Sequence, residues 1–498
     1  MKRRGSGVLL HVPSLHSRFG IGDLGPQAFR FVDFLVDAKQ SFWQILPLNP
    51  IEPAYGSSPY HSISAFACSS LFISPELLLQ DGLLNDEDIM SYPVFSYDRI
   101  DYAAVISSKR ELFFMAYQNF KKRTEKYDYR KFCQENSVWL DDYSLFAALK
   151  SHYNGKTWSD WPPELRDREN EALESAATEF HDRIDFEKFL QYIFFTQWFS
   201  LKQYCGERGI QIIGDMPIYV QYDSVDLWTH PEVFKLNEAK KPYAVAGVPP
   251  DYFSKTGQLW GNPLYRWDVL KDTGYRWWVQ RTKHALKLFD MVRIDHFRGL
   301  VGYWEIPAGE KTAMNGKWIE APAEDFLMTL LRKFPYLPVI AEDLGVITPD
   351  VREIMSRFEL PGMKILLFAF GDDLSTNPYI PHNLAKNCIV YPGTHDNNTV
   401  KGWFENEAAP EEKERLFQYL GREVSNEDIS WEFIRMAMMS VANLAVTSMQ
   451  DILNLGEEAR MNRPATTQGN WQWRLLPGQL SIQLSKKLRQ MTEIYGRA

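Results

Sequence analysis

Four acidic residues stand at the ends of short apolar segments that have the composition of buried strands. Asp215 ends IQIIGD, Asp295 ends MVRID, Glu342 ends VIAE, and Asp396 follows IVYPGTH. A strand interior has no use for an unpaired carboxylate, because burying such a charge is costly. The gaps between these acids leave room for the crossover helices that parallel strands require. We therefore expect the four carboxylates to converge on one pocket.

Two of these acids have sequence neighbours that favour opposite protonation states. Arg293 and Asp295 alternate along one strand and so point the same way, and the guanidinium is expected to lower the pKa of Asp295. An ionised carboxylate is what a nucleophile requires. Glu342 ends a nearly continuous apolar run, so burial is expected to raise its pKa, as a general acid requires. Such a pair about 5 Å apart is the arrangement of a retaining glycosidase, with Asp396 as a third acid for sugar hydroxyls.

Each of these residues also has a structural interpretation. Asp295 could form an ion pair with Arg293 or Arg298, and Glu342 could be a buried partner of Arg or Lys. The neighbouring His395 and Asp396 could bind a metal, but no HxxxH, HExxH or EF-hand pattern accompanies them, so no metal site is expected.

A second motif favours structure over chemistry. FGIGDLG places Gly20, Gly22 and Gly25 in G-x-G-x-x-G spacing before a helix. A dinucleotide site needs that turn to follow directly on a strand, with an acid at the end of the next strand. Here HVPSLHSR intervenes and FWQILPL ends without an acid, so we interpret the motif as a structural turn.

The elements that would position the acids alternate between helix and strand. Residues 26–40 and 275–289 carry apolar residues at helical spacing. Alternation through the second half favours a (β/α)8 TIM barrel over a doubly wound open sheet, with the acids at the barrel mouth. Strands are expected near positions 42, 70, 210, 291, 338, 363, 388 and 446.

Two insertions are expected in this single barrel of residues 1–498. Residues 76–185 show helical patterns and charged spacers, which predicts a largely helical insertion. A helix is expected over 185–209, with Asp185 as its N-cap. Residues 216–285 form the second insertion. Its aromatic, Pro- and Gly-rich stretch 244–267, which contains the loop 247–263, shows no periodicity. Its aromatic content argues against disorder and favours a lid with hinges at Gly257 and Gly261.

Composition excludes several classes of function. The net charge of −9 offers nothing to nucleic acid or an anionic membrane, so neither is expected as a partner. The four cysteines form no CxxC pair, which suits a reducing compartment and indicates neither disulfides nor zinc. The start MKRRGSGVLLHVPSL lacks the apolar core of a signal peptide, so a cytoplasmic location is expected. Aromatic residues make up 14% of the chain, and beyond filling a core they can stack on sugar rings.

The motifs GDMPIYV, RIDHFRG, AEDLG and GTHDNNT resemble the strand-end regions of the α-amylase superfamily. Five further stretches narrow the resemblance to 4-α-glucanotransferases of the amylomaltase, or disproportionating enzyme, type. They are LLHVPSLHSRFGIGDLG, LPLNP with YGSSPYHSISAFA, GVPPDYFSKTGQLWGNPLYRW, LPGMKILLFAF and EARMNRPATTQGNW. The resemblance spans nearly the whole chain. It implies retaining transfer of α-1,4-glucan segments between maltooligosaccharides or starch- and glycogen-derived glucans, without a cofactor.

The resemblance also implies residue roles. Asp295 would be the nucleophile, Glu342 the general acid/base and Asp396 the transition-state stabiliser. The GDMP segment lacks the Asn and His that help hold calcium in the wider superfamily, so no calcium site is expected. The implied substrate-binding residues are Asp215, Arg293, His296 and His395 around the sugar at the bond-breaking subsite, Tyr60 stacking on that sugar, Trp260 in the lid, and Asn462.

Three other functions remain open from the sequence. An α-glucan hydrolase on the same barrel would produce new reducing ends. A phosphorylase-type transferase would need phosphate and release glucose 1-phosphate. A catalytically inactive glycan-binding protein would show no turnover, although all three key carboxylates are present.

Overall fold

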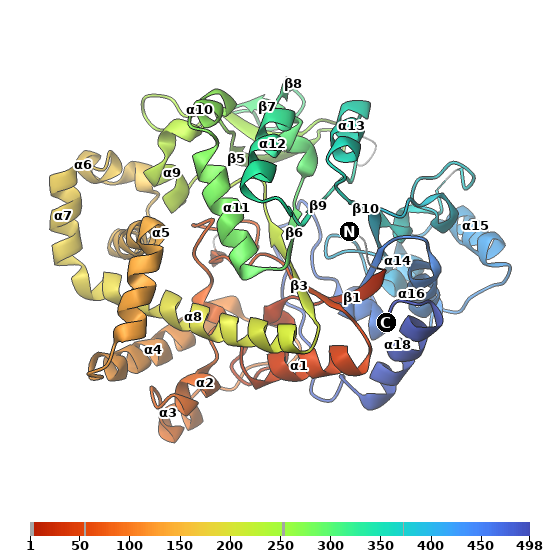
Figure 1. Cartoon of the computed structure of the whole chain (residues 1–498), viewed down its shortest axis with the longest axis horizontal. Coiled ribbons are helices and arrows are strands. Elements are labelled where there is room, and N and C mark those ends of the chain that lie inside the picture. The colour runs from red at the N-terminus through yellow and green to blue at the C-terminus, as the bar shows by residue number, and fades with distance from the viewer. Residues whose placement is uncertain (1–3, 54–55, 251–253, 372) are drawn as a thin grey trace.

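Eight parallel strands close into a barrel within the residues that the computed structural model describes, which are 4–53, 56–250, 254–371 and 373–498 (Figure 1). Around the barrel the strand order is β1-β12-β11-β10-β9-β6-β3-β2. The expected (β/α)8 barrel is therefore confirmed. The strands are β1 (Gly5–Leu9), β2 (Phe42–Gln44), β3 (Gln211–Met216), β6 (Met291–Ile294), β9 (Val339–Ala341), β10 (Gly362–Ile365), β11 (Cys388–Tyr391) and β12 (Leu444–Ser448).

One of the eight strands differs from the sequence prediction. The segment near position 70 is a 3-10 helix, Ser70–Phe72, and the missing strand is β1, which pairs with both β12 and β2. Its sequence GSGVL begins with residues that rarely favour strands. Gly7 is required there, because a Cβ would come within 2.7 Å of the Phe42 carbonyl oxygen. A close approach between two backbones thus accounts for the composition that hid this strand.

Helices surround the barrel and join its strands. The helix predicted for residues 26–40 is α1 (Pro26–Asp37), which packs against the helices α8 (His181–Glu207) and α18 (Ile482–Ile494). The helix predicted for 275–289 is α11 (Arg276–Leu288). The remaining helices of the second half are α12 (Ala323–Lys333), α13 (Pro349–Arg357), α14 (Val400–Asn406), α15 (Pro410–Leu420), α16 (Ile429–Met439) and α17 (Met449–Ile452).

The helix that leads into β3 starts earlier than the sequence indicated. Because α8 begins at His181, Asp185 lies inside the helix and is not its N-cap. Its carboxylate instead accepts hydrogen bonds from the hydroxyl groups of Tyr117 (2.8 Å) and Tyr129. Gly209, at a φ of +73°, follows the helix in the left-handed conformation that commonly ends helices.

The region between β2 and β3 consists largely of helices, which gather on one side of the barrel (Figure 1). The long helices α4 and α5 run close to α8. We propose that residues 76–185 form an insertion subdomain of the single barrel. Its helices are α2 (Pro75–Gln80), α3 (Asp86–Met90), α4 (Tyr102–Lys121), α5 (Tyr127–His152), α6 (Pro163–Arg166) and α7 (Asn170–Glu179).

A four-stranded antiparallel sheet stands apart from the barrel strands, in the order β5-β4-β7-β8. Two of its strands lie in the stretch for which no periodicity was found, so that stretch contains more regular structure than expected. Residues 251–253 of the predicted lid lie outside the described residues. The sheet strands are β4 (Ala244–Val248), β5 (Gln258–Pro263), β7 (Gly302–Pro307) and β8 (Lys317–Glu320), and α9 (Val225–Thr229) and α10 (Trp267–Asp272) flank the first two in sequence.

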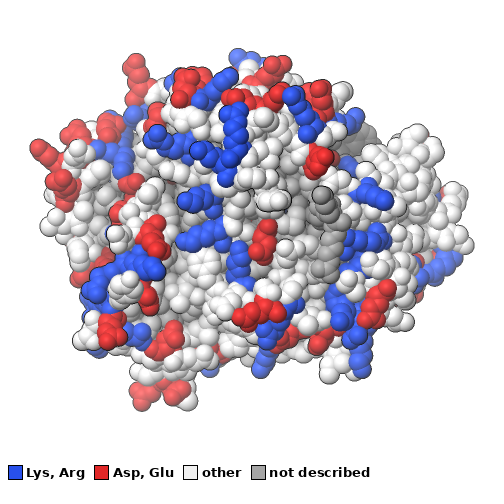
Figure 2. All heavy atoms as spheres, in the orientation of Figure 1, with Lys and Arg blue, Asp and Glu red and all other residues white. Residues whose placement is uncertain are grey.

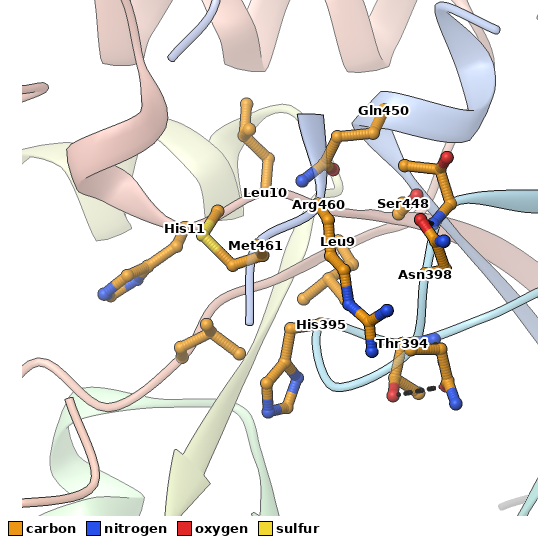
Figure 3. A pocket seen from close by; sticks show the side chains of 13 residues that line it. Leu9, Leu10, His11, Thr394, His395, Asn398, Ser448, Gln450, Arg460 and Met461 are labelled. Atoms are coloured by element: carbon orange, nitrogen blue, oxygen red, sulfur yellow. Dashed lines mark hydrogen bonds between the residues drawn. The ribbon is translucent and has the colours of Figure 1, made fainter. Parts of the chain in front are cut away.

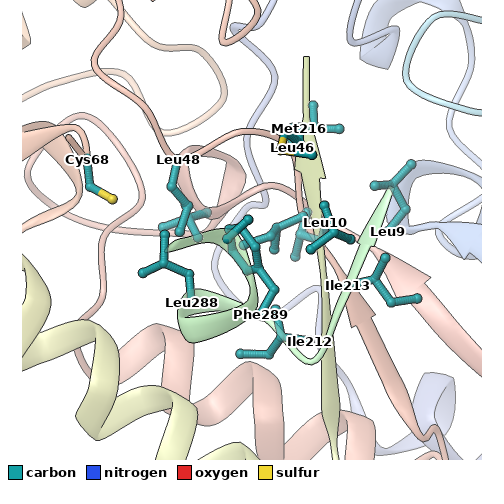
Figure 4. Packing of buried hydrophobic residues seen from close by; sticks show 14 of the residues in the cluster. Leu9, Leu10, Leu46, Leu48, Cys68, Ile212, Ile213, Met216, Leu288 and Phe289 are labelled. Carbon is teal, nitrogen blue, oxygen red and sulfur yellow. The ribbon is translucent and has the colours of Figure 1, made fainter. Parts of the chain in front are cut away.

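Apolar packing against the barrel orients the first of the four acids. Figure 4 shows Ile212 of β3 beside Phe289, which follows α11, whereas Ile213 points to the other side of the strand, toward Leu9 and Leu10. Gly214 lies directly against the Phe289 ring, where a Cβ would come within 2.1 Å of ring atoms. Because neighbouring strand residues face opposite sides, the next residue, Asp215, points away from the helix layer and into the barrel.

Candidate active site

A buried arginine joins three of the four strand-end acids. Arg293 on β6 donates from Nη1 to both carboxylate oxygens of Asp215, at 2.8 and 2.7 Å, and from Nη2 to Asp295 Oδ1 at 2.9 Å. The same Nη2 lies 3.8 Å from Glu342 Oε2. The oxygens of Asp295 and Glu342 that share this nitrogen are therefore less than about 7 Å apart. The adjacency of β3, β6 and β9 in the barrel brings these residues together, as the sequence predicted.

The protonation preferences of this pair differ in part from the prediction. Burial raises the pKa of Asp295 to about 6, although the charge of Arg293 acts in the opposite direction. The expected net lowering of that pKa was wrong, because desolvation outweighs one guanidinium that also serves Asp215 and Glu342. Burial raises the pKa of Glu342 to about 7, as expected. Both carboxyl groups therefore bind a proton more readily than free acids do, and burial acts more strongly on Glu342 than on Asp295.

His296 supports Glu342 through its backbone. Its φ of +47° turns the main-chain N–H toward Glu342 Oε2, which accepts this hydrogen bond at 2.5 Å. Burial, assisted by the charge of Arg298, lowers the pKa of the His296 imidazole to about 4, so the ring is neutral at physiological pH. The Trp260 ring packs edge-on against it with centroids 4.6 Å apart. Trp260 of β5 thereby contacts the residue whose backbone supports Glu342.

A second group of residues surrounds Asp396. Its Oδ1 accepts from Asn462 Nδ2 at 2.7 Å, and its Oδ2 lies 3.2 Å from His395 Nε2. Tyr60 donates its hydroxyl to Asp215 at 2.9 Å and lies 2.8 Å from His395 Nε2, which requires the imidazole proton to be on Nε2. Burial acts to raise the pKa of Asp396, but His395 and Asn462 outweigh it and hold that pKa below its usual range. Asp396 is therefore ionised.

The Tyr60 ring stacks on His395 with centroids 5.4 Å apart and an interplanar angle of 12°. This side chain thus links the Asp215 group to the Asp396 group. All ten residues named from the sequence lie in one connected network or in direct ring contact with it. Their spatial convergence is a property of the structure, whereas their individual roles are taken up as proposals below.

Two residues that the sequence analysis did not single out hold the Asp396 region in place. Arg460 donates to the carbonyl oxygens of Asn462 (2.9 Å) and Asp396 (3.4 Å) and forms an ion pair with Glu407 at 2.7 Å. Glu407 also accepts from Asn398 Nδ2. The only sequence signal was that Arg460 belongs to the segment EARMN, two residues before Asn462.

A pocket adjoins the site at His395 (Figure 3). Its walls come from segments that follow β1, β11 and β12, including His11, Thr394, Gln450 and Met461. Burial lowers the pKa of His11 to about 3, so this imidazole is neutral. The pocket therefore extends the barrel mouth beyond the carboxylates with both polar and apolar side chains.

The surface and the ligand chemistry of the described residues add two observations. Positive and negative side chains are interspersed on the face shown in Figure 2, so that face carries no large field of one sign. In the described part of the chain, no group of three or more His, Cys, Asp or Glu residues is arranged to hold a metal ion, and no helix is long and apolar enough to cross a lipid bilayer.

A parallel barrel with an acidic pair of this kind at its mouth defines an enzyme that acts on glycosidic bonds. Comparison with known proteins gives the family: a family model described as 4-alpha-glucanotransferase matches residues 10–480. The chain therefore belongs to the 4-alpha-glucanotransferase family, whose members are glycosyltransferases acting on α-1,4-glucans.

Individual relatives cover the chain from end to end. It is 47% identical to a 4-alpha-glucanotransferase of Aquifex aeolicus over 99% of both chains. It is 42% identical to a chloroplastic/amyloplastic 4-alpha-glucanotransferase of Solanum tuberosum, covering 99% of this chain and 87% of the relative. Among solved structures, an amylomaltase from Streptococcus agalactiae in complex with acarbose matches with a TM-score of 0.96 and 41% identity over the full length of both chains.

Proposed function

We propose that this 4-α-glucanotransferase moves a segment of α-1,4-glucan to the 4-hydroxyl of another glucan or of glucose by a retaining double displacement. The observation that carries the proposal is the Asp295–Glu342 pair on one Arg293 nitrogen. Retaining enzymes need carboxyl groups about 5 Å apart, with the second acting as nucleophile, whereas inverting enzymes need about 6.5–9.5 Å for a water. The shared nitrogen favours the shorter separation.

In the first step, Glu342 protonates the oxygen of the departing glucan while Asp295 attacks the anomeric carbon. The glycosidic bond breaks, and a covalent glycosyl-enzyme of inverted configuration forms on Asp295. The higher pKa of Glu342, about 7 against about 6 for Asp295, suits Glu342 as the proton donor and Asp295 as the nucleophile. The backbone N–H of His296 stabilises Glu342 when it has lost that proton.

In the second step, the 4-hydroxyl of an acceptor glucan replaces the departed chain. Glu342 now accepts the proton of that hydroxyl, and attack on the glycosyl-enzyme restores the α-linkage. Asp396, which is held ionised by His395 and Asn462, would stabilise the positive charge that develops on the sugar ring. Asp215, Arg293, His395 and Tyr60 would bind the same sugar.

Transfer has to outcompete hydrolysis, although water is far more concentrated than any acceptor. A bound and oriented acceptor can reach effective molarities on the order of 10⁵ M or more. We propose that the 247–263 segment, with Trp260 beside His296, closes over the acceptor and excludes water. Gly257 and Gly261, at φ values of +68° and +78°, would act as its hinges.

The substrates would be maltooligosaccharides and glucans derived from starch or glycogen, and the enzyme would act in the cytoplasm. The absence of a CxxC pair among four scattered cysteines supports that location. The interspersed positive and negative side chains on the face in Figure 2 fit an uncharged polymer better than a polyanion.

Incubation with maltotriose, without phosphate or metal, tests the function directly. Disproportionation yields glucose and a ladder of longer maltooligosaccharides while the total number of reducing ends stays constant. A steady rise in reducing ends would identify a hydrolase instead, and absence of any new product would indicate a glycan-binding protein. Asp295→Asn, which keeps the shape of the side chain, is the matched inactive control.

The lid has its own test in the variant Trp260→Ala. Because the proposed lid excludes water, this variant is expected to raise the ratio of hydrolysis to transfer, measured as new reducing ends per glucose transferred. An unchanged ratio at any level of residual activity would contradict a role of Trp260 in excluding water.

A further inference from the structure

Trp318 is an unusual residue for this protein because of where its ring lies. The chain has 16 tryptophans, all within the described residues, and Trp318 is the most exposed of them at 41%. Large aromatic side chains are normally removed from water, since their burial is strongly favourable. An exposed indole that is nevertheless held rigidly is a typical surface for a flat apolar ligand.

Two neighbours fix the Trp318 ring. The guanidinium of Arg298 lies 3.9 Å from its centroid, which is a cation–π contact on one face. The directly paired Trp304 on β7 meets it with centroids 5.3 Å apart at an angle of 65°. Trp304 is itself anchored, because its indole N–H donates to the Ala313 carbonyl at 2.8 Å. The exposed surface of Trp318 is therefore the side that these neighbours leave open.

Arg298 connects this ring to the active site. It follows Asp295 by three residues, so Trp318 lies within roughly 20 Å of the nucleophile, given about 3.8 Å per residue and one extended side chain. Its Nη1 also donates to Thr348 at 2.6 Å, in the segment that follows Glu342. Because both segments leave the carboxyl ends of barrel strands, the ring belongs to the same end of the barrel as the carboxylates.

We propose that Trp318 is an outer subsite that stacks on a glucose unit of a long α-1,4-glucan, away from the bond that is cleaved. The inference rests on the proposed glucan transfer. The apolar face of a pyranose ring matches an indole face, and Glu320, which shares a face of the exposed strand β8 with Trp318, offers its carboxylate to the sugar hydroxyl groups. In this proposal, only a glucan long enough to extend from the carboxylates past the Arg298 segment reaches the ring.

The experiment compares kcat/KM for amylose with kcat/KM for maltotriose in Trp318→Ala, Trp318→Phe and the parent. Trp318→Ala is expected to lower the amylose-to-maltotriose ratio about fivefold, the effect of one lost stacking contact. Trp318→Phe keeps an aromatic face and is expected to retain most of the ratio. Tyr336, which is 93% exposed and precedes β9 at the opposite end of the barrel, supplies the control Tyr336→Ala, with an unchanged ratio.

Each outcome decides the matter. An unchanged ratio in Trp318→Ala, or an equal loss on both substrates, overturns the subsite. Absence of transfer in the parent enzyme on either substrate would instead refute the proposed function. If Trp318→Ala does not fold, as judged by its thermal unfolding, Trp318→Gln removes the ring with less loss of volume and is held to the same criterion.

Discussion

Replacing Glu342 by glutamine should abolish transfer and, at alkaline pH, stabilise the fold. The side chain is only 13% exposed, and burial raises its pKa from 4.5 to about 7. A group whose folded-state pKa is raised favours the folded state most below its unfolded pKa, and this contribution is lost as pH rises through 7. At pH 8 the folded protein thus carries an ionisation cost of about 3 kcal/mol, at about 1.4 kcal/mol per tenfold change.

Glu342→Gln removes this cost, because the neutral amide has the shape of the protonated acid and its oxygen can still accept from the His296 N–H. For a chain of 498 residues, with an unfolding entropy of about 1 kcal/mol per kelvin, the variant should melt about 3 °C higher than the parent at pH 8. At pH 5 the folded protein holds Glu342 protonated but the unfolded chain is largely ionised, so the difference should shrink to about 1 °C or less, and it should vanish below about pH 4.

Calorimetric scans of the parent and of Glu342→Gln at the two pH values measure this difference in Tm. Glu125 is exposed, so the control Glu125→Gln should leave Tm unchanged at both pH values. An equal Tm difference at pH 5 and pH 8, or a variant less stable than the parent at pH 8, would refute the reasoning. Either result would mean that Arg293 compensates Glu342 fully and that no raised pKa prepares it as an acid.

Two further predictions concern this network, and a third concerns a buried arginine elsewhere in the fold. The reaction needs Asp295 ionised and Glu342 protonated, so kcat/KM for maltotriose should rise as the pH passes about 6 and fall above about 7. A flat profile between pH 5 and 9 would contradict the roles assigned to these two residues. Arg460→Lys keeps the positive charge but loses the guanidinium, whose several N–H groups contact Asn462, Asp396 and Glu407. The kcat for transfer should therefore fall about tenfold with little change in Tm. A change in KM alone would refute this prediction. Arg497 is fully buried and donates hydrogen bonds to the carbonyl oxygens of Gly5, Met438 and Ala442. Because Arg497→Met leaves these carbonyl groups without a donor, the variant should have a Tm about 3 °C lower and an unchanged KM. An unaltered Tm would show that the carbonyl groups find other partners.

Local features of the sequence were sufficient for the barrel and the acids. Each acid ends an apolar run, and in parallel sheets strand ends meet at one edge, so convergence could be predicted without coordinates. Helices with a clear apolar stripe, such as α1 and α11, were predicted within a few residues of their observed ends. By contrast β1 was missed, because Gly5, Ser6 and Gly7 suit a tight contact with β2 and not an isolated strand.

The order of residues alone specified the chemical groups of the site and the end of the barrel at which they lie. The balance of charges around them was decided only by the tertiary structure. Arg293 lies two residues before Asp295 in the sequence. Whether its charge lowers the pKa of Asp295 depends on how far the fold removes that carboxyl group from water, and on Asp215 and Glu342 interacting with the same guanidinium. Likewise, only the fold shows that Trp318 remains exposed. The burial of a carboxyl group and its ion pairs depend on residues that are far apart in the sequence, so a local sequence pattern cannot predict them.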